Sequence, residues 1–259
     1  MDLGIKGRKA IICASSRGLG RACAMELAAA GCDVVINGRD KAVTEAAADA
    51  IRKETGAHVT VVLGDVSVKA TQDALLAACP EPDILINNNG GPPPKGFREL
   101  DRAAIAEGVV QNMVTPIELI QRVIDGMASR KFGRIVNITS SSVKAPIIGL
   151  DLSSGARAGL TAFLAAPSRE VASANVTINN ILPGVFDTDR QKTATKRMAA
   201  IKGMSESEIV SARMKDVPAG RLGTPDEFGK LCAFICSAHA GYITGQNFLI
   251  DGGAIRTAF

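Results

Sequence analysis

The stretch KAIICASSRGLGRACAMELAAAGCDVVINGRD, residues 9–40, decides the fold of this chain. It holds two apolar β-type runs, residues 9–15 and 33–39, separated by an Ala-rich helical pattern that Gly18 and Gly20 open and Gly31 ends. A strand, a helix and a second strand joined by short loops favour a parallel pair with a crossover helix, and such crossovers are almost always right-handed. The stretch therefore predicts a β-α-β unit.

The same alternation continues along the chain. Further β-type runs cover residues 58–66, 82–90, 133–142, 176–184 and 248–253, and helical patterns cover residues 41–55, a segment ending near residue 79, and residues 101–129 and 153–174. We expect an α/β fold, a single doubly wound parallel sheet of the Rossmann type with helices on both faces. Residues 1–259 would form one dinucleotide-binding and catalytic domain, with ligands at the carboxyl ends of the strands.

Composition excludes several classes of protein. Apolar residues make up 46% of the chain but aromatic residues only 3%, which favours a core of aliphatic strands and closely packed helices. The net charge of +4 is spread without a dense basic stripe, so neither a nucleic-acid nor a membrane partner is expected. No signal peptide or membrane-spanning run is apparent, and a cytoplasmic location is expected.

Metal binding is not expected either. The six cysteines form no Cys-x-x-Cys pair, and the two histidines have no ligand-like neighbours in sequence. We therefore expect free, buried thiols and no metal site. The residues concerned are Cys13, Cys23, Cys32, Cys79, Cys232, Cys236, His58 and His239.

Two segments interrupt the alternation. The run GGPPPKGF, residues 90–97, contains three prolines and is expected to form a stiff non-helical lip after the fourth strand. Residues 190–217 are rich in Lys, Arg, Met and Ala, and the run SESE at 205–208 predicts a capping box that starts a short helix. This second segment is either a substrate lid or an ordinary surface helical hairpin.

The loop ASSRGLG, residues 14–20, lies between the first strand and its helix. Backbone N–H groups and the helix dipole at such a position can hold a pyrophosphate. Ala14 stands where the three-glycine dinucleotide fingerprint usually has a glycine. The candidate cofactor contacts in this loop are Ser15, Ser16, Arg17 and Leu19.

The second strand indicates which dinucleotide would bind. It ends in INGRD, and no acidic residue occupies the position that usually holds the adenosine ribose hydroxyls. Arg39 and Arg17 offer planar donors suited to a 2′-phosphate, so NADP(H) is preferred over NAD(H). The alternative is that both arginines are solvated surface residues.

Several motifs together resemble the short-chain dehydrogenase/reductase family, close to its 3-oxoacyl-carrier-protein reductase-like branch. The resemblance covers nearly all of the chain. It rests on SSRGLG at 15–20, Asp65 with Val66, NNNG at 87–90, Asn112, RIVNITS ending in Ser140, LPGVFDT at 182–188, and the long run from Gly220 to Gly253.

The resemblance implies a set of cofactor contacts. Asp65 and Val66 would flank the adenine. The ribose would be lined by Asn87, Asn89 and Gly90, with Asn89 in place of the usual alanine, and the nicotinamide carboxamide and phosphate would be held by Pro183, Val185 and Thr188.

The resemblance also implies catalytic positions. In the family a serine and a tyrosine hydrogen-bond the substrate oxygen, the tyrosine donates a proton, a lysine lowers the pKa of that tyrosine and holds the ribose, and a helix asparagine supports them. Ser140 and Asn112 match by motif. The run SSGARAGL places Ser153 at the tyrosine position and Arg157 at the lysine position.

The proton source is therefore an open question in this chain. A serine hydroxyl is a weaker acid than a phenol and is shorter, and an arginine does not relay protons. The only tyrosine, Tyr242, lies near the C-terminus. Lys144 and Asp151, on the loop after Ser140, are either substitute proton donors or solvated loop charges.

Three functions remain open at this point. The first is an NADPH-dependent oxidoreductase acting on a carbonyl or a related imine, activated alkene or quinone. The second is a non-catalytic NADP(H)-binding sensor or partner subunit, and the third is non-redox chemistry of the lyase or dehalogenase type. The partner expected is a small molecule, and cationic side chains on the possible lid either favour an anionic one or form a solvated face, namely Arg190, Lys192, Lys196, Arg197 and Lys202.

The resemblance finally implies a homotetramer. Relatives pair through long helices and C-terminal segments, which here correspond to residues 101–129, 153–174 and 248–259.

Overall fold

One parallel sheet organises the molecule. The computed structural model describes residues 1–92 and 94–256, and within them seven strands pair in the order β3-β2-β1-β4-β5-β6-β7, every neighbouring pair being parallel. The strands are β1 (Lys9–Ile12), β2 (Asp33–Gly38), β3 (Val59–Leu63), β4 (Ile84–Asn87), β5 (Gly133–Ile138), β6 (Val176–Pro183) and β7 (Asn247–Ile250). The predicted doubly wound sheet is confirmed.

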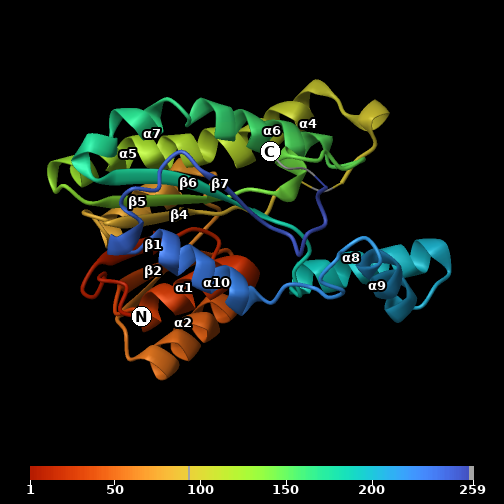
Figure 1. Ribbon diagram of the computed structural model, residues 1–259, viewed down its shortest axis with the longest axis horizontal. Helices are drawn as coiled ribbons and strands as arrows, with labels where there is room; N and C mark the ends of the chain where they lie inside the picture. Colours follow the sequence, from red (N-terminus) through yellow and green to blue (C-terminus); the bar gives the residue numbers. More distant parts are fainter. Residues whose placement is uncertain (93, 257–259) are drawn as a thin grey trace.

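Helices cover both faces of this sheet (Figure 1). On one face lie α1 (Gly18–Ala29), α2 (Lys41–Thr55) and α10 (Pro225–Ile235). The other face carries α3 (Lys69–Ala78), α4 (Arg102–Val109), α5 (Thr115–Ser129), α6 (Asp151–Phe163) and α7 (Pro167–Glu170). Alternate residues of a strand point to opposite faces, so Ile12 and Ile11 belong to two different apolar clusters, one under each helical layer.

The sheet strands are shorter than the β-type runs of the sequence. β1 ends at Ile12, β4 at Asn87 and β5 at Ile138, although the apolar runs were extended to residues 15, 90 and 142. Beyond these ends the chain turns into the loops at the carboxyl edge, although the Ser15 and Thr139 N–H groups still donate to the neighbouring strands, at the Asn37 and Ile181 carbonyls. The β-type runs of the sequence therefore overestimate the length of the strands at the edge where the candidate site lies.

The predicted helix over residues 153–174 was wrong in extent. α6 ends at Phe163, α7 starts at Pro167, and a 3-10 turn covers Ala172–Ala174. Proline has no N–H to donate to the carbonyl four residues earlier, and its ring clashes with that carbonyl. Pro167 therefore starts a new helix rather than continuing the old one.

The helical region predicted over residues 101–129 is continuous but not uniform. Five residues, Val110–Val114, form a π-helical turn between α4 and α5. Thr115 Oγ1 donates to the Val110 carbonyl at 2.8 Å, and Asn112 Nδ2 lies 3.4 Å from the Gly108 carbonyl. The wider turn places Asn112 on the buried side, where it is 4% exposed.

Residues 190–217 contain a helical hairpin, α8 (Asp189–Lys202) followed by α9 (Glu206–Met214). The predicted capping box is confirmed, since Ser205 Oγ accepts from the Glu208 N–H and the Glu208 carboxylate accepts from the Ser205 N–H. The hairpin projects past the carboxyl end of the sheet (Figure 1). This position is compatible with a lid, which stays a prediction.

The remaining short elements are 3-10 turns at Phe97–Glu99, Ser141–Val143 and Ala238–Ala240. The expected proline lip at 90–97 has no helix before Phe97, and Pro93 within it lies outside the described residues, as do residues 257–259 of the expected interface segment. In the part of the chain that the structure describes, no helix is long and apolar enough to cross a bilayer.

Candidate active site

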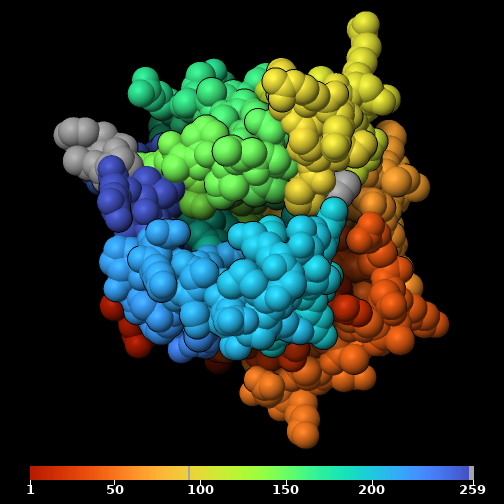
Figure 2. Space-filling view, turned by 90° about the vertical axis from the view of Figure 1, so that its right-hand side faces the viewer, coloured from red at the N-terminus to blue at the C-terminus, as the bar shows by residue number. Residues whose placement is uncertain are grey.

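The carboxyl ends of β1, β4, β5 and β6 meet at one edge of the sheet. The strand order reverses between β1 and β4, and ligands of doubly wound sheets bind in the crevice at such a reversal. Figure 2 shows this face, where the α8–α9 hairpin stands opposite the segments around residues 95–110 and 145–160 across a hollow. The motif residues of the sequence gather around this crevice.

The β1–α1 loop takes the sharp turn that its sequence suggested, without the usual first glycine. Ala14 adopts a left-handed conformation with φ of 43°. The Ala14 N–H donates to Asn37 Oδ1 at 3.1 Å, and the Ala14 carbonyl accepts from Asn88 Nδ2 at 3.0 Å. A Cβ on Gly20 would lie 2.6 Å from the Ala14 carbonyl oxygen, so the second glycine of the loop is required by close packing.

The predicted contacts of this loop have different environments. Ser15 is fully buried, and its Oγ donates to the Ile12 carbonyl at 2.7 Å and accepts from the Asn37 N–H at 3.0 Å, so the side chain fastens the loop to the sheet. Leu19 packs against the core. Arg17 is the N-cap residue of α1 and makes no side-chain capping bond, which leaves the first N–H groups of the helix without a side-chain acceptor.

A cleft of about 420 Å³ opens beside this helix N-terminus. Its lining residues come from the β1–α1 loop, α1, α2 and α8: Ser16, Arg17, Arg21, Ala42, Val43, Ala46, Ala47 and Asp189. Arg21 was missed in the sequence, although it lies four residues after Arg17 and therefore on the same face of the first helical turn.

Arg39, directly after β2, and Asp65, two residues after the end of β3, form a loose ion pair. Arg39 Nη1 lies 3.8 Å from Asp65 Oδ2, and the Arg39 side chain is 80% exposed. Such an exposed pair holds its partners weakly, so Arg39 is free to turn toward a ligand. Val66, the next residue, is buried and lines a pocket formed by the ends of β4 and β5 and by the π-turn.

A ladder of asparagines, unforeseen in the sequence, crosses the sheet beneath the site. Asn87 Nδ2 donates to Asn137 Oδ1, Asn137 Nδ2 to Asn180 Oδ1, and Asn180 Nδ2 to Asn247 Oδ1, at 2.9, 2.9 and 2.8 Å. The four residues are register partners on β4, β5, β6 and β7. Only the pairing of the strands brings them together.

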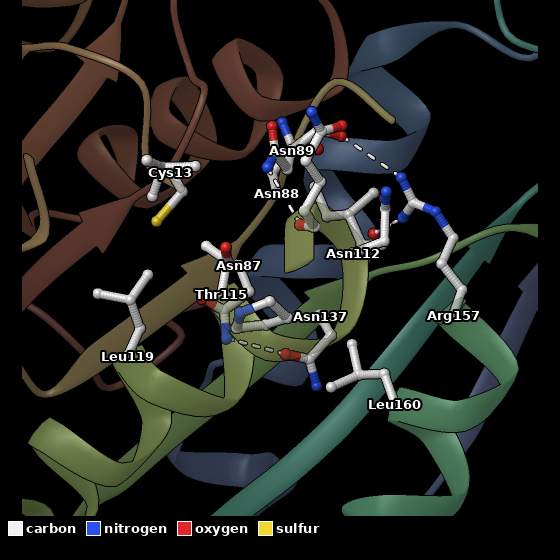
Figure 3. A pocket seen from close by; sticks show the side chains of 14 residues that line it. Cys13, Asn87, Asn88, Asn89, Asn112, Thr115, Leu119, Asn137, Arg157 and Leu160 are labelled. Carbon is white, nitrogen blue, oxygen red and sulfur yellow. Dashed lines mark hydrogen bonds between the residues drawn. The ribbon is translucent and has the colours of Figure 1, made fainter. Parts of the chain in front are cut away.

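An inner pocket lies between this ladder and the π-turn (Figure 3). Two amide oxygens, Asn87 Oδ1 and Asn112 Oδ1, are buried and have no hydrogen-bond partner within the described residues. Both residues line the pocket together with Cys13, and burial raises the pKa of the Cys13 thiol to about 12. The pocket thus offers acceptors, and its thiol is uncharged.

Ser140 lies two residues after Ile138, the last residue of β5, which lines this pocket. Its Oγ accepts from the Ser142 N–H at 3.1 Å and from Ser142 Oγ at 2.9 Å. The Ser140 hydroxyl proton is therefore free to point toward a ligand. Ser142 was not identified from the sequence, although it lies in the same serine run.

Ser153 and Arg157 lie one turn apart on α6 and interact directly. Arg157 Nε donates to Ser153 Oγ at 3.1 Å. The Arg157 guanidinium, 8% exposed as a residue, also donates to the carbonyls of Ile138, Thr139 and Asn89. Burial, with a smaller effect of nearby Arg190, lowers the pKa of Arg157 to about 10, so it is cationic at neutral pH.

The loop after β4 is held by the π-turn and by α8. Asn89 Nδ2 donates to the Gln111 carbonyl at 3.1 Å, and Asn89 Oδ1 accepts from the Gly90 N–H at 2.7 Å. Arg190, on α8, donates to the Gly90 carbonyl. The larger side chain at Asn89 is thus accommodated by bonding to the π-turn.

The residues after β6 approach the β1–α1 loop. Pro183 ends β6, the Val185 carbonyl accepts from the Gly223 N–H at 3.0 Å, and Thr188 caps α8. A Cβ placed on Gly18 would be 3.6 Å from Thr188 Cγ2, so the two loops lie next to each other.

The two suggested substitute proton donors lie on the surface. Lys144 and Asp151 are both exposed, and neither side chain makes a hydrogen bond or ion pair with Ser140, Ser153 or Arg157. Tyr242 is also fully exposed. Among the candidate polar groups Ser153 and Arg157 contact each other directly, and a role for Lys144 or Asp151 in proton transfer stays a prediction.

The sequence and the fold place this chain in a known class. The enoyl-(acyl carrier protein) reductase family model matches residues 13–254. The chain belongs to the short-chain dehydrogenase/reductase family.

Individual relatives are similar over almost their whole length. The chain is 31% identical to a 3-oxoacyl-[acyl-carrier-protein] reductase of Aquifex aeolicus, over 98% of this chain and 99% of the relative. It is 31% identical to an NADPH-dependent reductase of Bacillus subtilis, over 96% and 98%.

Solved structures agree with this placement. An NADPH-dependent reductase involved in bacilysin biosynthesis matches with a TM-score of 0.91 and 30% identity, over 97% of this chain and 100% of the other. L-sorbose reductase from Gluconobacter frateurii, in complex with NADPH and L-sorbose, matches with a TM-score of 0.94 and 26% identity, over 99% and 100%.

Proposed function

We propose that this protein is an NADPH-dependent reductase of a small-molecule carbonyl, or of a related imine, activated alkene or quinone. The similar reductases named above support the reaction class and the nucleotide. The crevice itself also supports the proposal. The N-terminus of α1 lies there with Arg17 and Arg39. Uncharged hydroxyl and amide groups are provided by Ser140, Ser153 and Asn112.

The residues present fit such a cofactor. The N-terminal N–H groups of α1 have no side-chain cap, and the packing at Gly20 keeps the loop close to the helix, which suits a pyrophosphate. Arg17 and the loosely held Arg39 would hold a 2′-phosphate, with Asp65 and Val66 beside the adenine. The ribose and nicotinamide would lie among Asn87, Asn89, Gly90, Arg157, Pro183, Val185 and Thr188.

The nicotinamide, when bound, supplies a hydride. The chain's own groups then have to orient the acceptor and provide a proton. Ser140 Oγ has its proton free, and Ser153 Oγ accepts from Arg157 Nε, so the Ser153 proton is free as well. The two hydroxyls would hydrogen-bond the substrate oxygen, and Asn112, within the π-turn, would support the pocket wall behind them.

The Ser153–Arg157 hydrogen bond is the observation that carries this proposal. In our proposal it takes the place of the family's tyrosine–lysine pair. The buried guanidinium stabilises negative charge developing near Ser153. A serine is still a poor general acid, and a missing acid costs roughly 10²–10⁴ in rate, so the site suits acceptors whose charge is already present or delocalised.

The test is NADPH oxidation over ketones, cyclic imines, quinones and electron-poor alkenes, with the wild type and the Ser153→Tyr/Arg157→Lys double variant side by side. Turnover by the wild type on any of these substrates supports the reductase. Turnover gained only by the double variant would overturn it in favour of a non-catalytic NADP(H)-binding protein. Product formation that does not need the nucleotide would instead indicate non-redox chemistry.

Cofactor preference has its own test. In thermal unfolding, NADPH at a hundredfold excess over its Kd should stabilise the protein by about 2.7 kcal/mol. NADH at the same concentration should stabilise it clearly less. Arg17→Gln and Arg39→Gln should reduce the difference between the two nucleotides, and equal shifts with NADPH and NADH in the wild type would contradict the preference.

A further inference from the structure

Arg157 and Arg190 lie close together. They lie at the part of the crevice next to Ser153, where the proposed reaction would take place, which we call the reaction end. A Cβ on Gly91 would be 3.5 Å from Arg157 Nη2 and 3.5 Å from both terminal nitrogens of Arg190. The guanidinium groups are therefore separated by at most twice that distance. Arg157 comes from α6 and Arg190 from α8, so the lid segment brings one of the two charges.

No carboxylate of the described residues offsets these charges. Neither arginine forms an ion pair, and all their hydrogen bonds within the chain go to backbone carbonyls or to Ser153. Burial lowers the pKa of both groups, and Arg190 further lowers that of Arg157. Arg157 is buried and Arg190 is exposed at the rim, and two like charges this close together favour an anionic ligand.

The hydrogen bonds divide the roles of the two arginines. A guanidinium has five N–H donors. Arg157 already donates to Ser153, Ile138, Thr139 and Asn89, whereas Arg190 donates only to the Gly90 carbonyl. Arg190 therefore keeps a free planar edge for a bidentate contact, and Arg157 adds charge behind it.

The other cationic side chains of α8 do not take part. All five side chains, Arg190 included, are exposed, but Lys192 pairs with Asp187 at 3.3 Å, and Lys196, Arg197 and Lys202 form no hydrogen bond or ion pair with the described residues. They form the solvated face that was one of the two interpretations of this segment. Arg190 alone among the five contacts the loop after β4.

We propose that Arg190, supported by the charge of Arg157, binds a carboxylate of the substrate, so that the substrate is a small organic acid. This rests on the proposed function and specifies its substrate class. The exposed apolar side chains at Phe97, Ile147 and Ile148 lie on loops joined by the Lys95 N–H bond to the Gly149 carbonyl. They favour an apolar body on the acid.

A phosphate of the cofactor is the other source of an anion. The pyrophosphate position at the α1 N-terminus faces Thr188, two residues before Arg190. The contacts of Arg157 with Ser153 and Thr139, in contrast, lie at the reaction end. The experiment must therefore measure acid binding and nucleotide binding separately.

The probes are two matched pairs, cinnamate with cinnamamide and phenylpyruvate with its amide, titrated calorimetrically into the NADP⁺ complex. The members of a pair share their shape and differ in charge. We expect the acid to bind about tenfold more tightly than the amide. This preference should vanish in Arg190→Gln, return in part in Arg190→Lys, and persist in Arg197→Gln, the exposed control on the same helix.

NADPH titrations of the same variants complete the test. Arg190→Gln should keep its NADPH affinity within about twofold of wild type. Loss of NADPH affinity with the acid preference retained would assign Arg190 to a cofactor phosphate and overturn the proposal. So would equal binding of acid and amide, or binding of neither, in both pairs.

The two proposals fail in different ways. A protein that prefers the acids but turns over no acceptor would retain the carboxylate site and lose the reductase function. A protein that reduces neutral acceptors and shows no preference for acids would retain the function and lose the carboxylate site.

Discussion

At the scale of single residues, Arg134 shows what burial demands of a charged side chain. It is 1% exposed, donates to the carbonyls of Ser237, Gly133 and Asn175, and lies over the Phe132 ring at 4.4 Å. These bonds compensate for the desolvation that lowers the pKa of the guanidinium. The residue ties β5 to the segments that precede β6 and follow α10.

Replacing Arg134 by Met should therefore destabilise the fold by about 2–4 kcal/mol, because three carbonyl acceptors lose their donor. Urea unfolding measures the change. Arg8→Met is the matched control, since Arg8 also lies over the Phe132 ring, at 3.9 Å, but its side chain is 37% exposed. A cost at Arg134 no larger than at Arg8 would contradict this account.

Ala14 is a second residue that affects the stability of the fold, here through its backbone conformation. With φ of 43° it carries the strain of a left-handed alanine, which is about 1–2 kcal/mol. Ala14→Gly removes the strain but loosens the unfolded chain by about 0.4–1 kcal/mol. We expect a net gain of about 0.5–1 kcal/mol in thermal unfolding.

The control for Ala14→Gly is Ala29→Gly, at the exposed last residue of α1. A glycine there should destabilise the protein by up to about 1 kcal/mol, because it lowers helix propensity. Changes of the same sign at both positions would show that strain does not govern Ala14.

At the scale of elements, the position and stability of α10 depend on the cap at its N-terminus and on one close approach to α1. A Cβ at Gly229 would lie 2.6 Å from the Ala22 carbonyl, so the glycine lets α10 pack directly on α1. The helix begins with a capping box in which the Glu227 carboxylate accepts from the Thr224 N–H at 2.8 Å and from Arg221 Nη2 at 2.6 Å.

This cap should make the stability of the protein depend on pH. The hydrogen bond from Arg221, with those from Thr224, lowers the pKa of Glu227 from 4.5 to about 2. The stabilisation is complete above about pH 4.5 and is lost as the pH falls toward 2, because the folded state holds the ionised form.

Glu227→Gln removes the titrating group and should flatten the profile. The difference in unfolding free energy between wild type and variant, measured in denaturant from about pH 6 to about pH 3, should shrink as the pH falls. A difference that stays constant or grows on acidification would exclude this role. Asp226→Asn in the same helix turn is the control for a general loss of charge.

At the scale of the whole molecule, the outer surface of the α4–α6 layer indicates further assembly. Large apolar side chains remain exposed there, Ile105 at 48%, Val110 at 39%, Val114 at 36% and Phe163 at 51%. Large apolar side chains exposed on one helical layer are typical of protein interfaces. The homotetramer implied by the family resemblance stays a prediction.

Sedimentation equilibrium should give about four times the chain mass of 26.9 kDa. Phe163→Glu should shift the distribution to smaller species, since a charge would be buried in the interface. Val68→Glu, at another exposed apolar residue, should not. A monomeric wild type would contradict the prediction.

The sequence by itself determined the order of elements and the edge where the site lies. The pattern of residues 9–40 repeats with short connections, and parallel pairing with right-handed crossovers leaves few other arrangements. The family resemblance assigned catalytic positions to Ser140, Asn112, Ser153 and Arg157, which stay predictions, and the structure brings Ser153 and Arg157 into contact.

Only the tertiary structure decided which distant groups meet. Arg190 reaches Gly90 across 100 residues, and the ladder from Asn87 to Asn247 needs the register of four strands. Pro167 divides a helix that the pattern ran together, and the π-turn at Asn112 has no sequence signature. Sequence periodicity reports local backbone geometry, whereas tertiary packing selects the contacts between distant segments. Those contacts bring the charges of Arg157 and Arg190 together at the site.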